Sequence, residues 1–360
     1  MSDERYAWQS RTFTLWANNN YHGILKAVTG SGKSYAALDC IRKYRVIYPD
    51  SIIWVVCDYN ELKQQWTDLL ASSGLSDVPV YLYGRAGQLL SNAEHLPDFL
   101  VLDEVHHLEA EQWGKVADFG VKHLLGLSAT PNTECKKIGK IIQRIGFDQA
   151  FIAPSTSHLV VFGMNEEERA AYLAKCNALA SYSEKHPHST YRNDFVYMQL
   201  VNRRKAVVDS FPKRWEIGLE IVKRNFGRRM MLFFSKQAEV RAFAALLDAE
   251  GIPYAIQMSS CKQIEQFKSG KKDLLLSINM VATGFSDPTV EVGVMFTYPY
   301  SPRDAIQKVG RILRPNGDKH ADIYYLIADG TMEESISKRK NQLFPPNTVK
   351  METDRDYHEA

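Results

Sequence analysis

A glycine-rich segment places the strongest constraint on the fold of this chain. Residues 27–34, Ala-Val-Thr-Gly-Ser-Gly-Lys-Ser, lie between an apolar run at 23–28 and an amphipathic run at 34–45. These runs predict a strand and a helix, which is the context of a phosphate-binding loop. The two glycines let the backbone curl close to a phosphate, and the N–H groups that open the helix face the anion. Lys33 would add a positive charge at the β- and γ-phosphates, and the Ser34 hydroxyl would complete a magnesium shell.

The phosphate-loop interpretation competes with a plainer one and assigns nucleotide contacts to six consecutive residues. An ordinary glycine–serine turn is the alternative, and the strand before the loop together with the helix after it argues against that. The strict nucleotide-loop pattern has a glycine where this chain has Ala27. We predict nucleotide binding by Thr29, Gly30, Ser31, Gly32, Lys33 and Ser34.

Two carboxylates follow a second predicted strand, at 99–102. They belong to Asp103 and Glu104, 70 residues after Lys33. A carboxylate at the carboxyl end of a strand lies on the ligand-binding edge of a parallel sheet. Asp103 would hold magnesium through a water molecule, and Glu104 would orient and deprotonate the attacking water. His106 would link the γ-phosphate region to neighbouring segments. Alone, such an acidic pair is most often a solvated strand end; its place after a phosphate loop favours catalysis.

The rest of the chain repeats the same architecture. With 360 residues it is long enough for two domains. Continuous apolar strands alternate with helices over the first 150 residues and again after Lys213, which predicts two parallel sheets covered on both faces. Between them, Asn165 and Glu168 predict the start of a helix, and a second helix is expected at about 194–210. The predicted division is a first α/β lobe at 1–157, a helical bridge at 158–213, a second α/β lobe at 214–345 and a flexible tail at 346–360.

Composition excludes several classes of protein. The chain is 45% hydrophobic and 24% charged, and it has no apolar run close to the roughly 18–20 residues that span a bilayer. With no signal peptide recognisable at the start, we predict a location in the cytoplasm (of the host, for a viral protein) or in a nucleus, and no membrane partner. The five cysteines lack metal-ligand spacing, which predicts free thiols. The net charge of +2 says little about partners.

These segments together resemble the motifs of a superfamily 2 helicase of the DEAH-like type, with Asp-Glu-Val-His at 103–106. The resemblance extends over about residues 6–340 and implies two RecA-like lobes. In the first lobe, 52–62 resembles motif Ia, although Cys57 and Asp58 replace the usual Pro-Thr. The segment 127–131 resembles the third motif, so the residues that couple ATP hydrolysis to the nucleic acid would be Ser128, Ala129 and Thr130.

The second lobe carries the remaining motifs of the family. Residues 232–235 resemble motif IV, 280–288 motif V and 307–315 motif VI. Asp287 lies one place later than the family's aspartate. The resemblance implies nucleic-acid contacts by Ser235, Thr283 and Gly284. It also implies catalytic roles for Gln307, Arg311 and Arg314, the two arginines acting as arginine fingers that neutralise charge on the γ-phosphate.

The resemblance implies an ATP- and Mg²⁺-dependent helicase or translocase that moves along a nucleic-acid strand in the 3′-to-5′ direction. Gln9 would read the adenine, because a side-chain amide can bond to both of its edges. The form of motif VI and the Gln65-Trp66 pair resemble DNA-acting relatives, including phage recombination helicases and restriction-enzyme ATPase subunits. DNA, single-stranded or branched, is therefore the favoured partner, with a protein that directs the motor to its target as a further one. The alternatives are an RNA helicase, a phosphate-loop ATPase that acts on protein, and a catalytically silent binding module.

Overall fold

The computed structural model describes residues 7–109, 115–132, 134–278, 287–339 and 348–357. The chain forms two compact units. The first comprises Met1–Pro154, Met280–Pro288 and Ser301–Lys319, and the second comprises Ser155–Asn279, Thr289–Tyr300 and His320–Ala360. Most of the predicted motif V, including Thr283 and Gly284, lies outside the described residues.

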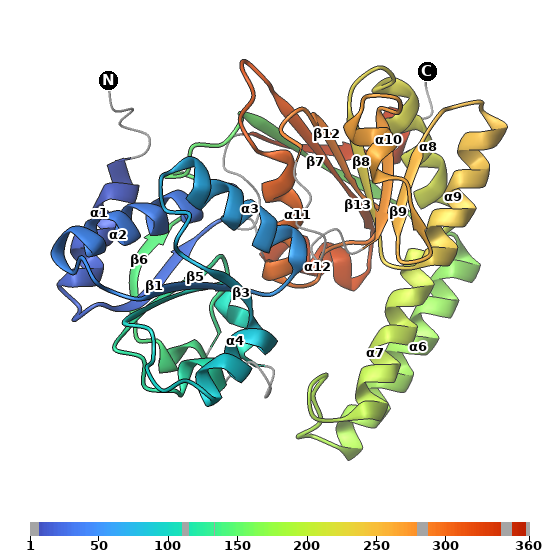
Figure 1. Cartoon of the computed structure of the whole chain (residues 1–360). Coiled ribbons are helices and arrows are strands. Elements are labelled where there is room, and N and C mark those ends of the chain that lie inside the picture. Colours follow the sequence, from blue (N-terminus) through green and yellow to red (C-terminus); the bar gives the residue numbers. More distant parts are fainter. Residues whose placement is uncertain (1–6, 110–114, 133, 279–286, 340–347, 358–360) are drawn as a thin grey trace. The chain divides into compact units, whose positions relative to one another are not determined.

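The first unit is built on a six-stranded parallel sheet (Figure 1) in the order β3-β2-β4-β5-β1-β6. Its strands are β1 His22–Ala27, β2 Ile53–Cys57, β3 Val80–Leu82, β4 Phe99–Asp103, β5 His123–Ser128 and β6 Ile141–Ile145. Its helices are α1 Ala7–Ala17, α2 Lys33–Ile47, α3 Asn60–Ser72, α4 Tyr83–Ser91 and α11 Pro302–Ile312.

Alternate strand residues face two different cores, as expected for a sheet covered on both sides. Leu25 and Val101 pack in one core with residues of α1, α2 and α3. Leu100 and Leu102 pack in the other with residues of α4. The two layers hold the carboxyl ends of β1, β2 and β4 at one edge, and the phosphate loop, the start of α3 and the acidic pair follow from those ends.

The second unit has an eight-stranded sheet in the order β10-β9-β11-β8-β12-β13-β7-β14. Only β10 runs antiparallel to its neighbour among the described strands. The strands are β7 Ser155–Phe162, β8 Met230–Phe234, β9 Ala255–Met258, β10 Cys261–Lys262, β11 Leu274–Ile278, β12 Val292–Met295, β13 Ala321–Ala328 and β14 Thr348–Thr353. The helices are α6 Glu166–Lys185, α7 Phe195–Asp209, α8 Pro212–Arg224, α9 Gln237–Ala249, α10 Ile264–Lys268 and α12 Met332–Arg339.

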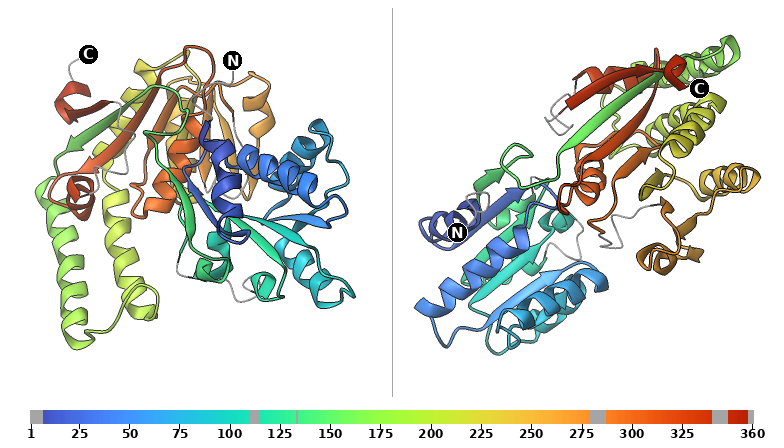
Figure 2. Two further views of the ribbon diagram at one scale, coloured as in Figure 1. Left: turned by 90° about the vertical axis from the view of Figure 1, so that its left-hand side faces the viewer. Right: turned by 90° about the horizontal axis from the view of Figure 1, so that it is seen from above.

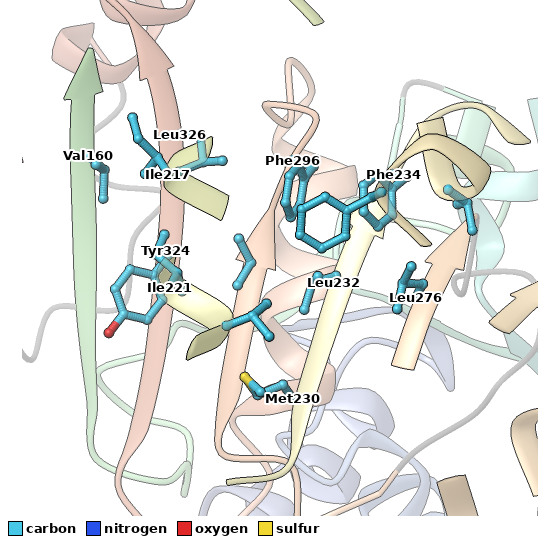
Figure 3. Close-up of a cluster of buried hydrophobic side chains, with 14 of the residues drawn as sticks. Val160, Ile217, Ile221, Met230, Leu232, Phe234, Leu276, Phe296, Tyr324 and Leu326 are labelled. Atoms are coloured by element: carbon cyan, nitrogen blue, oxygen red, sulfur yellow. The ribbon is translucent and has the colours of Figure 1, made fainter. Parts of the chain in front are cut away.

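Figure 3 shows a hydrophobic core of the second unit, where α8 lies over the sheet. Ile217 and Ile221 of α8 pack with Leu232 of β8, Phe296 after β12 and Leu326 of β13, and all five are almost completely buried. The helical segment before α8 is a hairpin of α6 and α7. The predicted cap is present, because the Asn165 side chain accepts from the Glu168 N–H and the Glu168 carboxylate accepts from the Asn165 N–H, both at 2.8 Å.

Three predicted segments differ from the structure. Residues 301–319, assigned to the second lobe, belong to the first compact unit, where the Ala153 N–H donates to the Leu313 carbonyl at 2.8 Å.

The other two segments are strands of the second unit. Residues 158–162, assigned to the helical bridge, form the end of β7, which pairs with β13 over its whole length. Residues 348–353, assigned to the flexible tail, form β14, which pairs in parallel with β7. His158 explains the place of β14, because its imidazole lies 2.6 Å from the Glu352 carboxylate of β14 and 2.9 Å from the Asp322 carboxylate of β13. Glu352 is 194 residues and Asp322 is 164 residues from His158 along the chain, so no local sequence pattern predicts the strand.

All five cysteines are free thiols, as predicted. Over the described part of the chain, no helix is long and apolar enough to cross a bilayer. No cluster of three or more metal-ligating His, Cys, Asp or Glu side chains occurs in that part either.

Candidate nucleotide site

The phosphate loop joins β1 to α2 in a conformation that requires glycine. Gly30 and Gly32 have φ angles of 84° and 94°, in the left-handed region that side-chain-bearing residues rarely adopt. A Cβ at position 30 would lie 2.8 Å from the backbone oxygen of Gly310, and one at position 32 would lie 2.5 Å from the Gln9 amide nitrogen. The loop is therefore closely packed from two sides, by α1 and by α11.

Lys33 lies inside the curl of this loop. Its side chain is buried, and its ammonium group donates to the Ala27 carbonyl at 3.2 Å. The same ammonium lies 4.0 Å from a Glu104 carboxylate oxygen. The Ser31 hydroxyl donates to the Val28 carbonyl at 2.7 Å, which braces the loop from within. The lysine charge is thus held between the loop and the acidic pair, where a phosphate group could bind.

The acidic pair is fixed by hydrogen bonds to both oxygens of Asp103. One oxygen accepts from the Trp66 indole N–H at 2.8 Å, and the other accepts from the Glu104 backbone N–H at 2.9 Å. Burial, and then the charge of Glu104, raise the pKa of Asp103 to about 6. Burial also acts to raise the pKa of Glu104, but Lys33 and His106 outweigh it and lower that pKa to about 2. Glu104 is thus an ionised base at neutral pH.

Glu104 itself has an unusual backbone. Its φ angle is +51°, which costs energy for a residue with a side chain and occurs mostly where the surroundings enforce it. The conformation turns the chain sharply from β4 into a short 3₁₀ segment at Val105–Glu109. The Glu104 carboxylate consequently lies beside Lys33 and lines the same cavity as that residue.

The residues predicted to couple the site to a nucleic acid are joined by hydrogen bonds. His106 Nδ1 lies 3.2 Å from a Glu104 carboxylate oxygen and 3.2 Å from the Ser128 hydroxyl oxygen. The Ser128 oxygen also accepts from the Thr130 N–H at 3.1 Å. Ala129, between them, is buried. A continuous polar path therefore runs from the predicted base to the segment after β5.

Motif VI contributes one buried and one partly buried cation to the same cavity. Arg311 at the end of α11 and Arg314 just after it line a space of about 480 Å³ with Lys33, Asp103 and Glu104. Burial, and then the neighbouring Arg311, lower the pKa of Arg314 to about 10. Burial also lowers the pKa of Arg311. Two neighbouring guanidinium groups that are largely withdrawn from water are stabilised by an anion, and phosphate accepts their hydrogen bonds well. Gln307 is buried one turn earlier on the helix.

The side chains present fit ATP with Mg²⁺. Positive groups on two sides of the cavity match a triphosphate. Thr29 of the phosphate loop also lines the cavity, and its buried hydroxyl has no hydrogen-bond partner among the described residues. The Ser34 hydroxyl and the Asp103 carboxylate both line the cavity, and oxygen atoms of this kind are the ligands that Mg²⁺ prefers.

Sequence reasoning placed Gln9 near the nucleotide, and the structure places it against the phosphate loop. Its amide donates to the Gly32 carbonyl at 3.2 Å. Adenine recognition by Gln9 stays a prediction. Ser235, the predicted nucleic-acid contact of motif IV, belongs to the second unit, where its hydroxyl lies 3.1 Å from the Glu239 carboxylate.

Three residues of the site were missed because their partners are distant in sequence. Trp66 holds Asp103, and the Asp58 carboxylate lies 2.9 Å from the His107 imidazole. Tyr59 lines the cavity and hydrogen-bonds to Arg311. The spacing of Leu62, Trp66 and Leu70 predicts only the buried face of a helix. The one available signal was the indole N–H of Trp66, since a buried donor needs an acceptor.

Comparison with known families gives the same assignment as the motifs. Residues 213–316 match the family described as helicase conserved C-terminal domain, and residues 4–88 and 76–133 match the family described as type III restriction enzyme, res subunit. The putative DNA 3′-5′ helicase Rad25 of Haloarcula marismortui is 26% identical over 88% of this chain and 51% of its own length. These matches place the chain in the superfamily 2 helicase class, as the motifs predicted.

Other similar proteins act on different nucleic acids, according to their names. The probable ATP-dependent RNA helicase pitchoune of Drosophila melanogaster is 23% identical over 81% of this helicase and 44% of its own length. The chain thus spans about half the length of each of these two relatives. The structure of S. cerevisiae Dbp5 bound to RNA and ADP BeF3 aligns with a TM-score of 0.65 at 14% identity, over 98% of this chain and 90% of that one. The two-lobed RecA-like fold is confirmed.

Proposed function

We propose that this helicase hydrolyses ATP at the cavity between the phosphate loop, the acidic pair and α11, and uses the energy to move along a DNA strand in the 3′-to-5′ direction. One observation carries the hydrolysis: an ionised Glu104 and three buried or nearly buried cations, Lys33, Arg311 and Arg314, line one cavity. The choice of DNA and of direction is supported by the relatives named as DNA 3′-5′ helicases.

The residues have distinct parts in the reaction. Lys33 and the phosphate-loop N–H groups bind the β- and γ-phosphates. Glu104 accepts a proton from the attacking water while the water oxygen bonds to the γ-phosphorus. The bond from that phosphorus to the bridging oxygen breaks, which releases ADP. Arg311 and Arg314 neutralise the charge that develops on the transferred group. Ser34 and Asp103 would hold Mg²⁺, which draws negative charge from the phosphate oxygens.

Coupling follows the polar path from the base. A change in charge at Glu104 during hydrolysis alters what His106 can donate, and His106 contacts Ser128. Ser128 holds the backbone of Thr130. Because a hydrogen-bonded path can take two arrangements, it can report the state of the nucleotide to the segment that follows β5.

RNA is the second candidate track, because RNA helicases are also among the relatives. An ATPase that moves protein is a third. ATP hydrolysis measured without nucleic acid and with single-stranded DNA, duplex DNA and RNA separates them. We expect strong stimulation by DNA. Greater stimulation by RNA would replace DNA as the track, and indifference to all three would contradict movement on any nucleic acid.

Lys33→Ala is expected to reduce the stimulated rate of hydrolysis by about a hundredfold, because one preorganised cation facing the transferred phosphate is lost. Lys43→Ala is the matched control. Lys43 is on the same helix, half exposed, with its ammonium 2.7 Å from the Asp39 carboxylate. A stimulated rate that survives Lys33→Ala would place hydrolysis at another site or in a contaminant.

Trp66→Phe is expected to shift the acid limb of the hydrolysis rate to higher pH. The indole N–H stabilises the ionised Asp103, whose pKa is already raised to about 6 by burial, so its removal raises that pKa further. A charged hydrogen bond of this kind corresponds to about one pH unit. The measurement is kcat/KM between about pH 5.5 and 8 at several Mg²⁺ concentrations.

The control for this shift is Trp54→Phe, on β2 of the same unit, where the indole packs against Tyr81. If Trp66→Phe and Trp54→Phe lower the rate equally at every pH, Trp66 has a packing role only. Recovery of the wild-type profile at high Mg²⁺ would support the positioning role, since metal binding favours the ionised carboxylate.

A further inference from the structure

The end loop and the following helix of the α6–α7 hairpin in the second unit carry more positive than negative charge. Figures 1 and 2 show α6 and α7 projecting from the sheet of that unit, joined by a loop at the far end. From Lys185 to Lys205 the chain has five Lys or Arg residues and one carboxylate, that of Asp194. The first turn of α6, at the base, carries Glu166, Glu167 and Glu168 instead.

The single carboxylate of this stretch, that of Asp194, stabilises the loop through hydrogen bonds. Asp194 accepts hydrogen bonds from the Ser189 and Tyr182 hydroxyls, at 2.5 and 2.9 Å, and from the N–H groups of Val196 and Tyr197, at 2.8 and 3.0 Å. These bonds lower the pKa of Asp194 to about 2. The loop is thus preorganised, which reduces the entropy that a ligand must remove on binding.

The ordered loop presents aromatic side chains to solvent. Phe195 is 66% exposed and Tyr191 is 45% exposed. The Lys205 ammonium lies 5.2 Å from the centre of the Tyr191 ring and 4.4 Å from that of Tyr300. One exposed apolar residue needs no explanation, but aromatic rings gathered with cations form the surface that unpaired bases and phosphates bind.

This surface continues from a predicted nucleic-acid contact. Asp209 at the end of α7 lies 3.8 Å from the Lys236 ammonium, and Lys236 directly follows Ser235 of motif IV. A strand held at Ser235 would therefore meet α7 next. Along that helix, Lys205 and then the loop of Tyr191 supply further positive charge and rings.

We propose that the α6–α7 hairpin is an arm that binds single-stranded nucleic acid through its α7 side and its end loop. Phosphates lie against Arg192, Arg203 and Lys205, and bases stack on Phe195 and Tyr191. The inference rests on the proposed movement along a nucleic-acid strand and adds to it a second binding surface outside the helicase motifs. Contacts of this kind tolerate any base sequence.

Fluorescence anisotropy with a labelled thymidine 20-mer tests the arm in the full chain. Phe195→Ala is expected to weaken binding about 5- to 150-fold, the range for loss of one stacked base. Arg192→Glu is expected to weaken binding and to reduce the salt dependence of the logarithm of the binding constant by about 0.7. A uridine 20-mer is expected to respond to both variants in the same way.

Lys271→Glu is the matched control, because Lys271 is exposed and precedes β11, at the sheet edge opposite to Ser235. It is expected to bind as the wild type does, and thermal unfolding checks the fold of each variant. If the wild type binds the 20-mer and both arm variants bind it equally well, the arm is overturned while the helicase function stands. If the wild type binds neither 20-mer, the proposed function itself is overturned and the arm with it.

Discussion

Glu104→Gln is expected to slow ATP hydrolysis by about 10²- to 10⁴-fold, the contribution of a general base, while ATP still binds. The pKa of Glu104 is lowered to about 2, so the wild-type side chain is ionised throughout the working pH range. Glutamine has nearly the same shape but cannot accept the proton of the attacking water. Single-turnover hydrolysis gives the chemical step, and a fluorescent ATP analogue gives the binding step.

The same substitution changes Asp103 in the opposite sense. The charge of Glu104 is the second cause of the raised pKa of Asp103, after burial, so its removal lowers that pKa. Asp103 then stays ionised to a lower pH, and Mg²⁺ binding is expected to be retained. Loss of activity in Glu104→Gln could not therefore be assigned to loss of the metal.

Glu61→Gln provides the control for Glu104→Gln, because Glu61 is exposed in the first turn of α3. Its rate is expected to match that of the wild type. A Glu104→Gln rate within a few-fold of the wild type would exclude this residue as the base, and His106 would be the next group to test.

The parts of the site that the sequence predicted are those governed by local backbone rules. A strand, two glycines and a helix that starts at Lys33 determine a phosphate loop within about ten residues. Asp103 and Glu104 follow a strand, and the carboxyl ends of parallel strands meet at one edge of the sheet. The structure places these groups on one cavity. The presence of Arg311 and Arg314 there, about 280 positions after Lys33, follows from family resemblance alone.

The parts that were missed depend on pairs that only the tertiary structure brings together. Trp66 has the spacing of a core residue, and its hydrogen bond to Asp103 joins positions 37 apart. The strand β14 has six residues and lies where the sequence predicts a flexible tail; its Glu352 bonds to His158, 194 positions earlier. Helix boundaries set by local caps, such as that at Asn165, were predicted correctly because the partner is only three residues away.

Arg214→Met is expected to be the most destabilising of these substitutions, at about 3–5 kcal/mol in the free energy of unfolding of the second unit. The guanidinium is 1% exposed, and it donates to the Phe296 and Leu326 carbonyls at 2.7 and 3.0 Å and to the Glu333 carboxylate at 2.6 Å. It therefore joins the start of α8 to the ends of β12 and β13. Methionine fills much of the volume but leaves the Glu333 charge buried without its cation.

Urea unfolding followed by far-UV circular dichroism measures this loss. Lys213→Met is the control on the preceding residue, where a partly exposed lysine pairs with Asp354. That pair is expected to contribute less than about 1 kcal/mol. The double variant Arg214→Met, Glu333→Met is expected to recover part of the stability, because no buried charge then remains.

Comparison of the single and double variants distinguishes a stranded charge from simple loss of packing. If the uncompensated Glu333 charge causes much of the loss, Arg214→Met with Glu333→Met is expected to be more stable than Arg214→Met alone, because breaking one partner of a buried pair costs more than replacing both by apolar residues. An equal or greater loss in the double variant would mean that the arginine acts through its packing and its two carbonyl bonds.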